Sequence, residues 1–345
     1  MGNINMHSKT IAIVTQPLSN NYGGLLQNFA LQQFLKKMKF QSMTIDVRNR
    51  NPTPLWRYLL SWGKTFLFLF IPKRRRNFSK FFIYQSRRKW ADDFISVFIN
   101  TTKKCNKYSK QLLIDYGIDI VIVGSDQVWR PKYNCRIEDS YLRFAGNIPI
   151  KRIAYAASFG VDNWEYSLKQ TRKCSELAQK FDAIGVREET GVKLCKENLD
   201  VDAAWVLDPT LLLMKEDYLP ICKDVPVCSE RYLAVYLLDE KEAVKTFYEK
   251  EANTRGLVVK KFYSDLKSTL TVPEWLAMFR DASYVVTDSF HGTVFSIIFG
   301  KEFKCMYNKN RGITRLDSLL GLYNSGKLEE MRIFSINWLR NALEK

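Results

Sequence analysis

Histidine is scarce in this chain, with His7 and His291 the only two among 345 residues. The seven cysteines are scattered and none forms the CxxC spacing of a zinc site, so we expect free thiols, a reducing cytoplasm and no bound metal. The GxSxG, P-loop and HExxH motifs are absent from the sequence, so nothing indicates the enzyme classes that these motifs mark. No GxGxxG follows the first apolar run, which disfavours a nicotinamide enzyme.

Long uncharged apolar runs are also missing. The main candidate, residues 55–71, spans 17 residues and contains Arg57 and Lys64, so it is short and too charged for a comfortable membrane span. The first residues, MGNINMHSKT, carry no apolar stretch, so we expect no signal peptide. These observations predict a cytoplasmic protein.

Acidic residues are too few to balance the basic ones. Lys and Arg number 53 against 36 Asp and Glu, which gives a formal charge of +17. Such a charge indicates an anionic partner, whether nucleic acid, an acidic membrane face or a phosphorylated substrate. Because no recognised nucleic-acid module accompanies the charge, we do not expect nucleic acid.

Short β-like runs alternate with helical runs along most of the chain. This βαβ rhythm predicts an α/β fold with parallel sheets covered by helices. We expect two Rossmann-like domains that face each other, with a cleft between the carboxyl ends of their strands. The predicted strands are Ile11–Thr15, Met43–Val47, Ile118–Val123, Arg152–Ala157, Asp182–Val186, Ala203–Leu207, Arg231–Leu238, Leu257–Lys260, Tyr284–Val286 and Glu302–Met306.

The expected domains are residues 1–205 and 206–330, joined near the VLDPT segment. A final helix within 331–345 is expected to pack back on the first domain. An insertion at about 52–100 interrupts the rhythm. Within it, residues 55–90 combine aromatic side chains with the basic block KRRR, which is typical of an anionic membrane interface. The alternative is a helical hairpin packed on the protein body.

The segment TDSFHGTVFSIIFG, residues 287–300, carries the central histidine on a predicted strand-to-helix turn. Free N–H groups at a helix start bind anions, and a histidine there can move a proton. The alternative is an ordinary helix cap with a buried histidine. The candidate residues of this turn are Asp288, Ser289, His291, Gly292 and Thr293.

Three other strand-end loops carry candidate ligand groups. The turn NYGG brings backbone close to a ligand, and VGSDQVW offers a base, an amide and a stacking face that suit a sugar; a helix cap explains the second equally well. Arg187 ends a strand, where a guanidinium can clamp a carboxylate or phosphate, although a surface ion pair is the commoner role. The acceptor candidates are Asn21, Tyr22, Gly23, Gln127 and Trp129, with Asp126 as a candidate base.

Taken in order, six segments resemble the polysaccharide pyruvyl transferase family. They are NYGGLLQNFALQQFL, VIVGSDQVW, RIAYAASFG, VREETGVKL, VLDPTLLL and TDSFHGTVFSIIFGKEF. The resemblance implies a fold similar to the two-domain GT-B glycosyltransferases. It also implies transfer of pyruvate from phosphoenolpyruvate onto two hydroxyls of a sugar as a cyclic ketal, with no further cofactor.

The resemblance assigns the family's cleft arginine to Arg187 and its histidine to His291. It also implies an arginine two positions before that histidine, where this chain has Ser289. Arg311 or Arg315 is expected to supply the missing cation from a neighbouring loop. In this scheme His291 protonates the donor, and Asp126 or Asp288 accepts a hydroxyl proton.

The acceptor is expected to be a sugar or lipid-linked oligosaccharide of a surface polysaccharide, on the cytoplasmic face of the membrane. This location matches the basic, aromatic insertion. Two alternatives remain. One is a GT-B glycosyltransferase that uses a nucleotide sugar, which the missing arginine favours. The other is a noncatalytic protein that scaffolds a membrane assembly.

Overall fold

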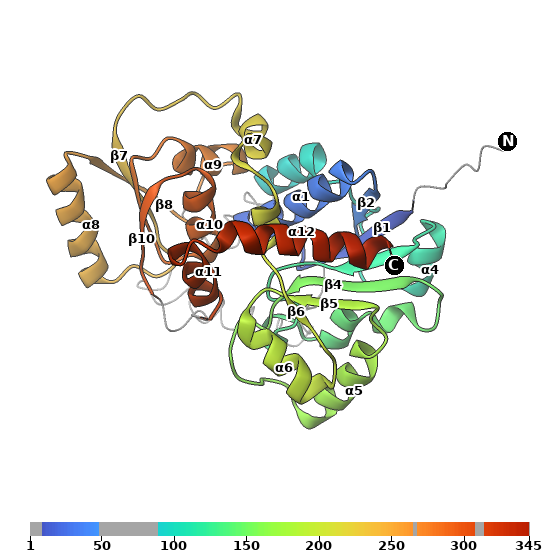
Figure 1. Cartoon of the computed structure of the whole chain (residues 1–345). Helices are drawn as coiled ribbons and strands as arrows, with labels where there is room; N and C mark the ends of the chain where they lie inside the picture. The colour runs from blue at the N-terminus through green and yellow to red at the C-terminus, as the bar shows by residue number, and fades with distance from the viewer. Residues whose placement is uncertain (1–8, 48–88, 265–267, 308–313, 345) are drawn as a thin grey trace, which may run out of the picture.

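The computed structural model describes residues 9–47, 89–264, 268–307 and 314–344. Within these ranges the chain builds two parallel β-sheets, each covered by helices, in two lobes that lie side by side (Figure 1). The predicted α/β fold with two Rossmann-like domains is confirmed. Residues 48–88 lie outside the described residues. They include most of the insertion predicted at about 52–100 and most of the proposed membrane segment 55–90.

The N-terminal sheet has six parallel strands in the order β2-β1-β3-β4-β5-β6. Its central strands are buried over most of their length because their β-branched and small side chains pack beneath helices on both faces. The strands are β1 (Thr10–Val14), β2 (Gln41–Thr44), β3 (Ile120–Val123), β4 (Lys151–Ala157), β5 (Ala183–Val186) and β6 (Ala204–Trp205).

The C-terminal sheet has four parallel strands in the order β10-β9-β7-β8. The central strands β7 and β9 are fully buried, whereas the edge strand β8 is partly exposed. The strands are β7 (Tyr232–Tyr236), β8 (Val258–Phe262), β9 (Tyr284–Thr287) and β10 (Glu302–Cys305). Each predicted strand is therefore present, with its ends shifted by at most three residues.

Helices connect these strands. The helices are residues 89–98, α1 (Tyr22–Lys37), α4 (Lys110–Asp115), α5 (Leu168–Ala178), α6 (Glu189–Leu199), α7 (Lys215–Tyr218), α8 (Glu242–Arg255), α9 (Val272–Arg280), α10 (Phe290–Ile298), α11 (Thr314–Asn324) and α12 (Leu328–Glu344). Serine, threonine and proline mark the N-termini of two helices. Ser167 and Thr271 form capping boxes at the starts of α5 and α9, and Pro273 lies in the first turn of α9.

The C-terminal helix α12 crosses from the second lobe to the first (Figure 1). Trp338 on this helix packs beside Tyr155 of β4, and a Cβ on Gly185 of β5 would lie 3.0 Å from the Trp338 ring. Ser335 accepts a hydrogen bond from the backbone N–H of Leu207 at 2.9 Å. The helix thus ties the junction between the domains to the N-terminal sheet. It begins at Leu328, earlier than the predicted last helix.

An aromatic stack also joins the two domains. The Tyr22 ring at the start of α1 lies between Trp90 and Trp275, with centroid distances of 4.6 and 5.2 Å. The Tyr22 hydroxyl donates to the carbonyl oxygen of Leu270 at 2.6 Å. These contacts fix the start of α1 against the C-terminal domain. None of the described helices has the length and apolar character needed to cross a membrane.

Candidate functional site

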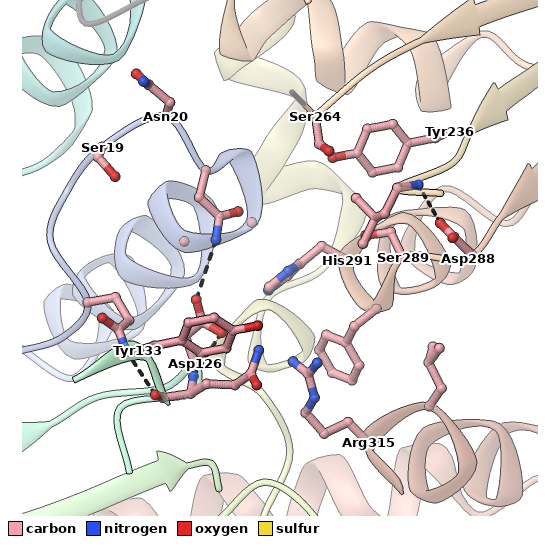
Figure 2. Close-up of a pocket in the computed structure, with 18 of the residues that line it drawn as sticks. Ser19, Asn20, Asp126, Tyr133, Tyr236, Ser264, Asp288, Ser289, His291 and Arg315 are labelled. Carbon is pink, nitrogen blue, oxygen red and sulfur yellow. Dashed lines mark hydrogen bonds between the residues drawn. The ribbon is translucent and has the colours of Figure 1, made fainter. Parts of the chain in front are cut away.

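A cavity of about 460 Å³ lies between the carboxyl ends of the two sheets. This is where an open α/β sheet places its ligands, because the strand-end loops diverge there. Figure 2 shows His291, Asp126 and Arg315 directed toward the same space from three different segments. The walls are formed by Gln16, Pro17, Ser19, Asn20, Asn21, Gly23 and Gly24 after β1, Asp126, Gln127 and Tyr133 after β3, Tyr236 at the end of β7 with Leu238 beyond it, Ser264 after β8, and Asp288 to His291 after β9, with Arg315 and Leu316 of α11.

His291 lies in the first turn of α10, two residues after the capping residue Ser289, whose hydroxyl accepts from the N–H of Gly292. Its residue exposure is only 8%, and its Nε2 has no hydrogen-bond partner. Burial lowers the pKa of His291; Asp208, 3.9 Å from Nε2, acts in the opposite direction, and Arg187 lowers it further. The lowered pKa favours the neutral imidazole at pH 7.

Gly23 lies directly against the imidazole ring. A Cβ at this position would lie less than 3.0 Å from three atoms of the His291 ring, a spacing that real side chains do not tolerate. At the next residue, Gly24, the nearest atom to a Cβ would belong to Asn21, at 3.4 Å, which is an acceptable contact. Glycine at position 23 is therefore required for the ring to occupy this place.

This contact predicts a sharp difference between two neighbouring variants. Gly23→Ala is expected to displace the His291 ring and lower pyruvyl transfer by at least about tenfold, because general-acid catalysis depends on geometry. Gly24→Ala should cause a much smaller loss, and its alanine favours the helix by about 1 kcal/mol. Turnover rates and urea unfolding of both variants test the pair; equal losses would contradict the close packing.

Arg187 lies behind the cavity wall, where it is 3% exposed. Its Nη1 donates to Asp208 at 2.8 Å, its Nη2 lies 3.5 Å from Asp126, and its guanidinium covers the Phe290 ring at 4.7 Å. Although burial lowers the pKa of Arg187, the carboxylates around it raise that pKa above its ordinary value. Arg187 is not among the residues that line this cavity, and its guanidinium faces Asp208 and Asp126.

Asp208 is a central residue of the site that the sequence analysis treated only as part of a junction. Its carboxylate accepts from Ser125, Arg187 and Thr210, and it is 1% exposed. Burial raises its pKa, but Arg187 and His291 lower it, and the net value is about 2. Asp208 is therefore ionised at pH 7.

Arg315 of α11 supplies a cation to the cavity. It is partly buried and lies over the Phe290 ring at 5.8 Å, so that Phe290 contacts both this arginine and Arg187. Burial and the charge of Arg187 lower its pKa to about 10, which leaves the guanidinium protonated at pH 7. Arg311, the other candidate for this role, lies outside the described residues.

The two candidate carboxylate bases have different surroundings. Asp126 has a left-handed backbone, with φ of 74°, and its Oδ1 accepts from the N–H of Gln127 at 2.8 Å. Its Oδ2 has only a 3.5 Å contact with Asn21. Asp288 accepts from the N–H groups of Leu238 and Asp239 at 2.6 and 3.2 Å, so its carboxylate anchors the loop after β7. Figure 2 shows Asp288 on the side of His291 that lies away from Asp126.

The remaining predicted residues divide into two groups. Asn21, Gly23, Gln127 and Ser289 line the cavity. Four others, which the sequence suggested as ligand groups, are not among the residues that line it. Trp129 is fully buried, donates to Ser140 and stacks on Tyr141; Tyr22 belongs to the interdomain stack; Gly292 and Thr293 are buried inside α10.

Several lining residues were missed. Tyr236 ends β7 and Ser264 follows β8, so the same strand-end rule predicts both positions. Phe290 stands beside His291 but reads from the sequence as ordinary core. The others are Gln16, Pro17, Ser19, Asn20, Gly24, Tyr133, Leu238 and Leu316. In the described part of the chain, no three His, Cys, Asp or Glu side chains are placed to hold a metal ion.

Comparison with known proteins agrees with this architecture. A family model described as polysaccharide pyruvyl transferase matches residues 21–310. UDP-GlcNAc 2-epimerase from Neisseria meningitidis bound to UDP-GlcNAc superposes with a TM-score of 0.52 and 10% identity over 97% of this chain and 99% of that chain. S. aureus MnaA with UDP gives 0.51 and 10% over 94% and 90%. At such identities the likeness concerns the fold alone. No curated protein sequence matches the chain.

The fold and the cavity define a two-domain protein of GT-B-like architecture, with a cavity between facing strand ends. The family match covers most of the chain, and the chain belongs to the polysaccharide pyruvyl transferase family. It is a transferase that moves pyruvate to a polysaccharide. The resemblance noted in the sequence is thereby confirmed.

Proposed function

We propose that the enzyme takes pyruvate from phosphoenolpyruvate and attaches it to two hydroxyls of one sugar as a cyclic ketal. The main support is the cavity arrangement of a buried imidazole, a cation and a carboxylate, contributed by His291, Arg315 and Asp126. Phosphoenolpyruvate is an anion that needs a cation and a proton donor, and the sugar needs a base. No metal is required by this chemistry.

Arg315 is the proposed donor-binding cation. The resemblance implies an arginine at position 289, but Ser289 uses its hydroxyl to cap α10 and offers no charge. Arg315 reaches the same wall of the cavity from α11, across the Phe290 ring. In this proposal Arg315 of α11 supplies the cation that the resemblance implies at position 289.

The proposed reaction begins with proton transfer from His291 to the methylene carbon of the donor, which makes C2 electron-poor. Binding of the anionic donor raises the proton affinity of the buried imidazole, because opposite charges favour each other in a buried site. One sugar hydroxyl attacks C2 and phosphate leaves. The second hydroxyl then closes the ketal on the same carbon.

Asp126 is the proposed acceptor of a hydroxyl proton. It lines the cavity, and its Oδ2 has only a long contact with Asn21, whereas Asp288 is engaged by two backbone N–H groups. Asn21 and Gln127 border the same side of the cavity and suit the acceptor sugar. Asp288 then has the separate task of fixing the loop that begins at Leu238.

The donor assignment predicts a charge-rescue result. Arg315→Gln should raise the KM for phosphoenolpyruvate by about 10- to 100-fold, the usual effect of losing a hydrogen bond to a charged group. Adding Ser289→Arg, which places a cation at the position where the resemblance implies one, should recover part of that loss. Steady-state kinetics of the parent and the two variants test this. An unchanged KM in Arg315→Gln would remove Arg315 from the donor site.

We further propose a lipid-linked acceptor at the inner face of the cell membrane, on the evidence of the basic and aromatic residues in 55–90. The protein is then expected to bind vesicles that contain anionic lipid and to leave them at high salt, since each basic residue near such a surface contributes about 1 kcal/mol. Neutralising Lys73, Arg74, Arg75 and Arg76 should weaken binding and leave activity on a soluble acceptor unchanged. Co-sedimentation measures this, and no binding by the parent protein would end the membrane proposal.

The second candidate is a glycosyltransferase that uses a nucleotide sugar, and the serine at position 289 is the observation that favours it. Thermal-shift measurements separate the two. The proposed function predicts that phosphoenolpyruvate raises the melting temperature and that the Arg315→Gln variant loses this response. Stabilisation by nucleotide diphosphates alone would favour the glycosyltransferase.

A further inference from the structure

Asp208 lies on the segment that joins the two domains, and it contacts groups from both. Ser125 and Arg187 follow β3 and β5 in the N-terminal domain, whereas His291 belongs to α10 of the C-terminal domain. Asp208 also caps the short 3-10 turn Pro209–Leu212 that starts the crossing to the second sheet. One carboxylate therefore stands where the two halves of the site meet.

The Asp208 carboxylate is held rigidly. Its Oδ1 accepts from the N–H and the hydroxyl of Thr210 at 3.0 and 2.6 Å. Its Oδ2 accepts from Ser125 at 2.7 Å and Arg187 at 2.8 Å. The distance from this Oδ2 to His291 Nε2 is 3.9 Å, too long for a hydrogen bond but close enough for a strong charge interaction in a buried site.

We propose that Asp208 is a positioning residue for the acid: its fixed carboxylate holds the proton on His291 across the junction between the domains. The inference rests on the proposed role of His291 as the proton donor. Because the carboxylate is fixed by the N-terminal domain and the ring by the C-terminal domain, the relative placement of the domains sets the strength of the interaction. Asp208 touches no reacting atom.

The other charged groups that face His291 show why this carboxylate is needed. Arg187 and Arg315 both oppose a proton on the ring, and so does the positive end of α1 at Gly23. Asp126 favours protonation, but its effect is smaller than that of Asp208. Asp208 is thus the principal group that offsets burial and the two arginines.

The chain offers a direct test because it has only two histidines. A His7→Gln background leaves His291 as the single imidazole in a nitrogen-15 histidine NMR titration. In this background Asp208→Asn retains an Oδ1 acceptor for Thr210 but removes the charge. The proposal predicts that the titration midpoint of His291 falls to lower pH. Ser125→Ala is the control, because it removes one hydrogen bond to Asp208 and keeps the charge, and its midpoint should stay near the parent's.

A second variant guards against failure to fold. Arg187→Met combined with Asp208→Asn removes both members of the buried pair, so no charge is left without its partner. The midpoint of His291 should still fall below the parent's, because Asp208 affects the ring more strongly than Arg187 does. An unchanged midpoint in either folded variant would overturn the proposal and leave Asp208 with a structural role only.

The kinetic consequence is a shift of the basic limb of the kcat/KM profile to lower pH in Asp208→Asn. At a pH above the His291 midpoint measured for the parent, the variant should lose about tenfold or more in kcat/KM for phosphoenolpyruvate, with a much smaller loss below the midpoint measured for the variant. A loss that is equal in both pH ranges would contradict the proposal. The NMR titration needs no turnover, so it can succeed or fail independently of the pyruvyl transfer reaction.

Discussion

Replacing His291 by glutamine is expected to lower turnover by about two to four orders of magnitude, because the variant loses the proposed general acid. Glutamine retains a polar side chain of similar reach, so the fold should remain intact and the donor should still bind. Turnover is measured with phosphoenolpyruvate and an acceptor sugar, beside a thermal melt of the same preparation.

His7→Gln is the matched control, since it removes the other histidine of the chain from a segment outside the described residues. It should retain the parent's turnover. Near-normal turnover by a folded His291→Gln protein would contradict the acid assignment. A variant that loses its melting transition would instead assign the histidine to the stability of α10.

Replacing Arg187 by methionine is expected to destabilise the protein by about 3–5 kcal/mol, the usual effect of leaving a buried charge without its partner. The charge left behind is Asp208, whose side chain is fully buried. Arg187→Lys should also be poorly tolerated, because a single ammonium cannot replace the planar contacts to Asp208 and Asp126. Urea unfolding of the three proteins gives the free energies.

The double variant Arg187→Met with Asp208→Asn should be less destabilised than the sum of its single variants, which is the signature of a coupled pair. Because Arg187 lies behind the cavity wall, the KM for phosphoenolpyruvate should change less in Arg187→Lys than in Arg315→Gln. The reverse order would place Arg187 in the donor site after all. Simple additivity of the unfolding free energies would contradict the coupling.

The sequence predicted the fold well because its buried strands are short, β-branched and regularly spaced. The carboxyl ends of parallel strands meet at one edge of a sheet, so His291, Asp126 and Gln127 could be assigned to the cavity from position alone. The same rule applied to Tyr236 and Ser264 would have added two further lining residues. Strand ends are therefore the most informative positions in this chain.

The direction in which each side chain points could not be predicted from the sequence. Trp129 and Asp126 stand three residues apart in one loop, yet the tryptophan turns into the core to stack on Tyr141 while the carboxylate faces the cavity. Arg187 looked like a ligand clamp because its partner Asp208, 21 residues further along the chain, could not be paired with it in advance. Arg315 lies on a helix far along the chain from the other candidate residues, and its packing over Phe290 could not be predicted from the sequence.

The most direct test of the proposed chemistry is mass spectrometry of an acceptor sugar incubated with the protein and phosphoenolpyruvate in deuterated water. The account predicts a mass gain of pyruvic acid minus one water, release of phosphate, and one deuterium in the new methyl group, delivered through His291. A product that gains a hexose from a nucleotide sugar, or a pyruvyl product with no solvent deuterium, would contradict it.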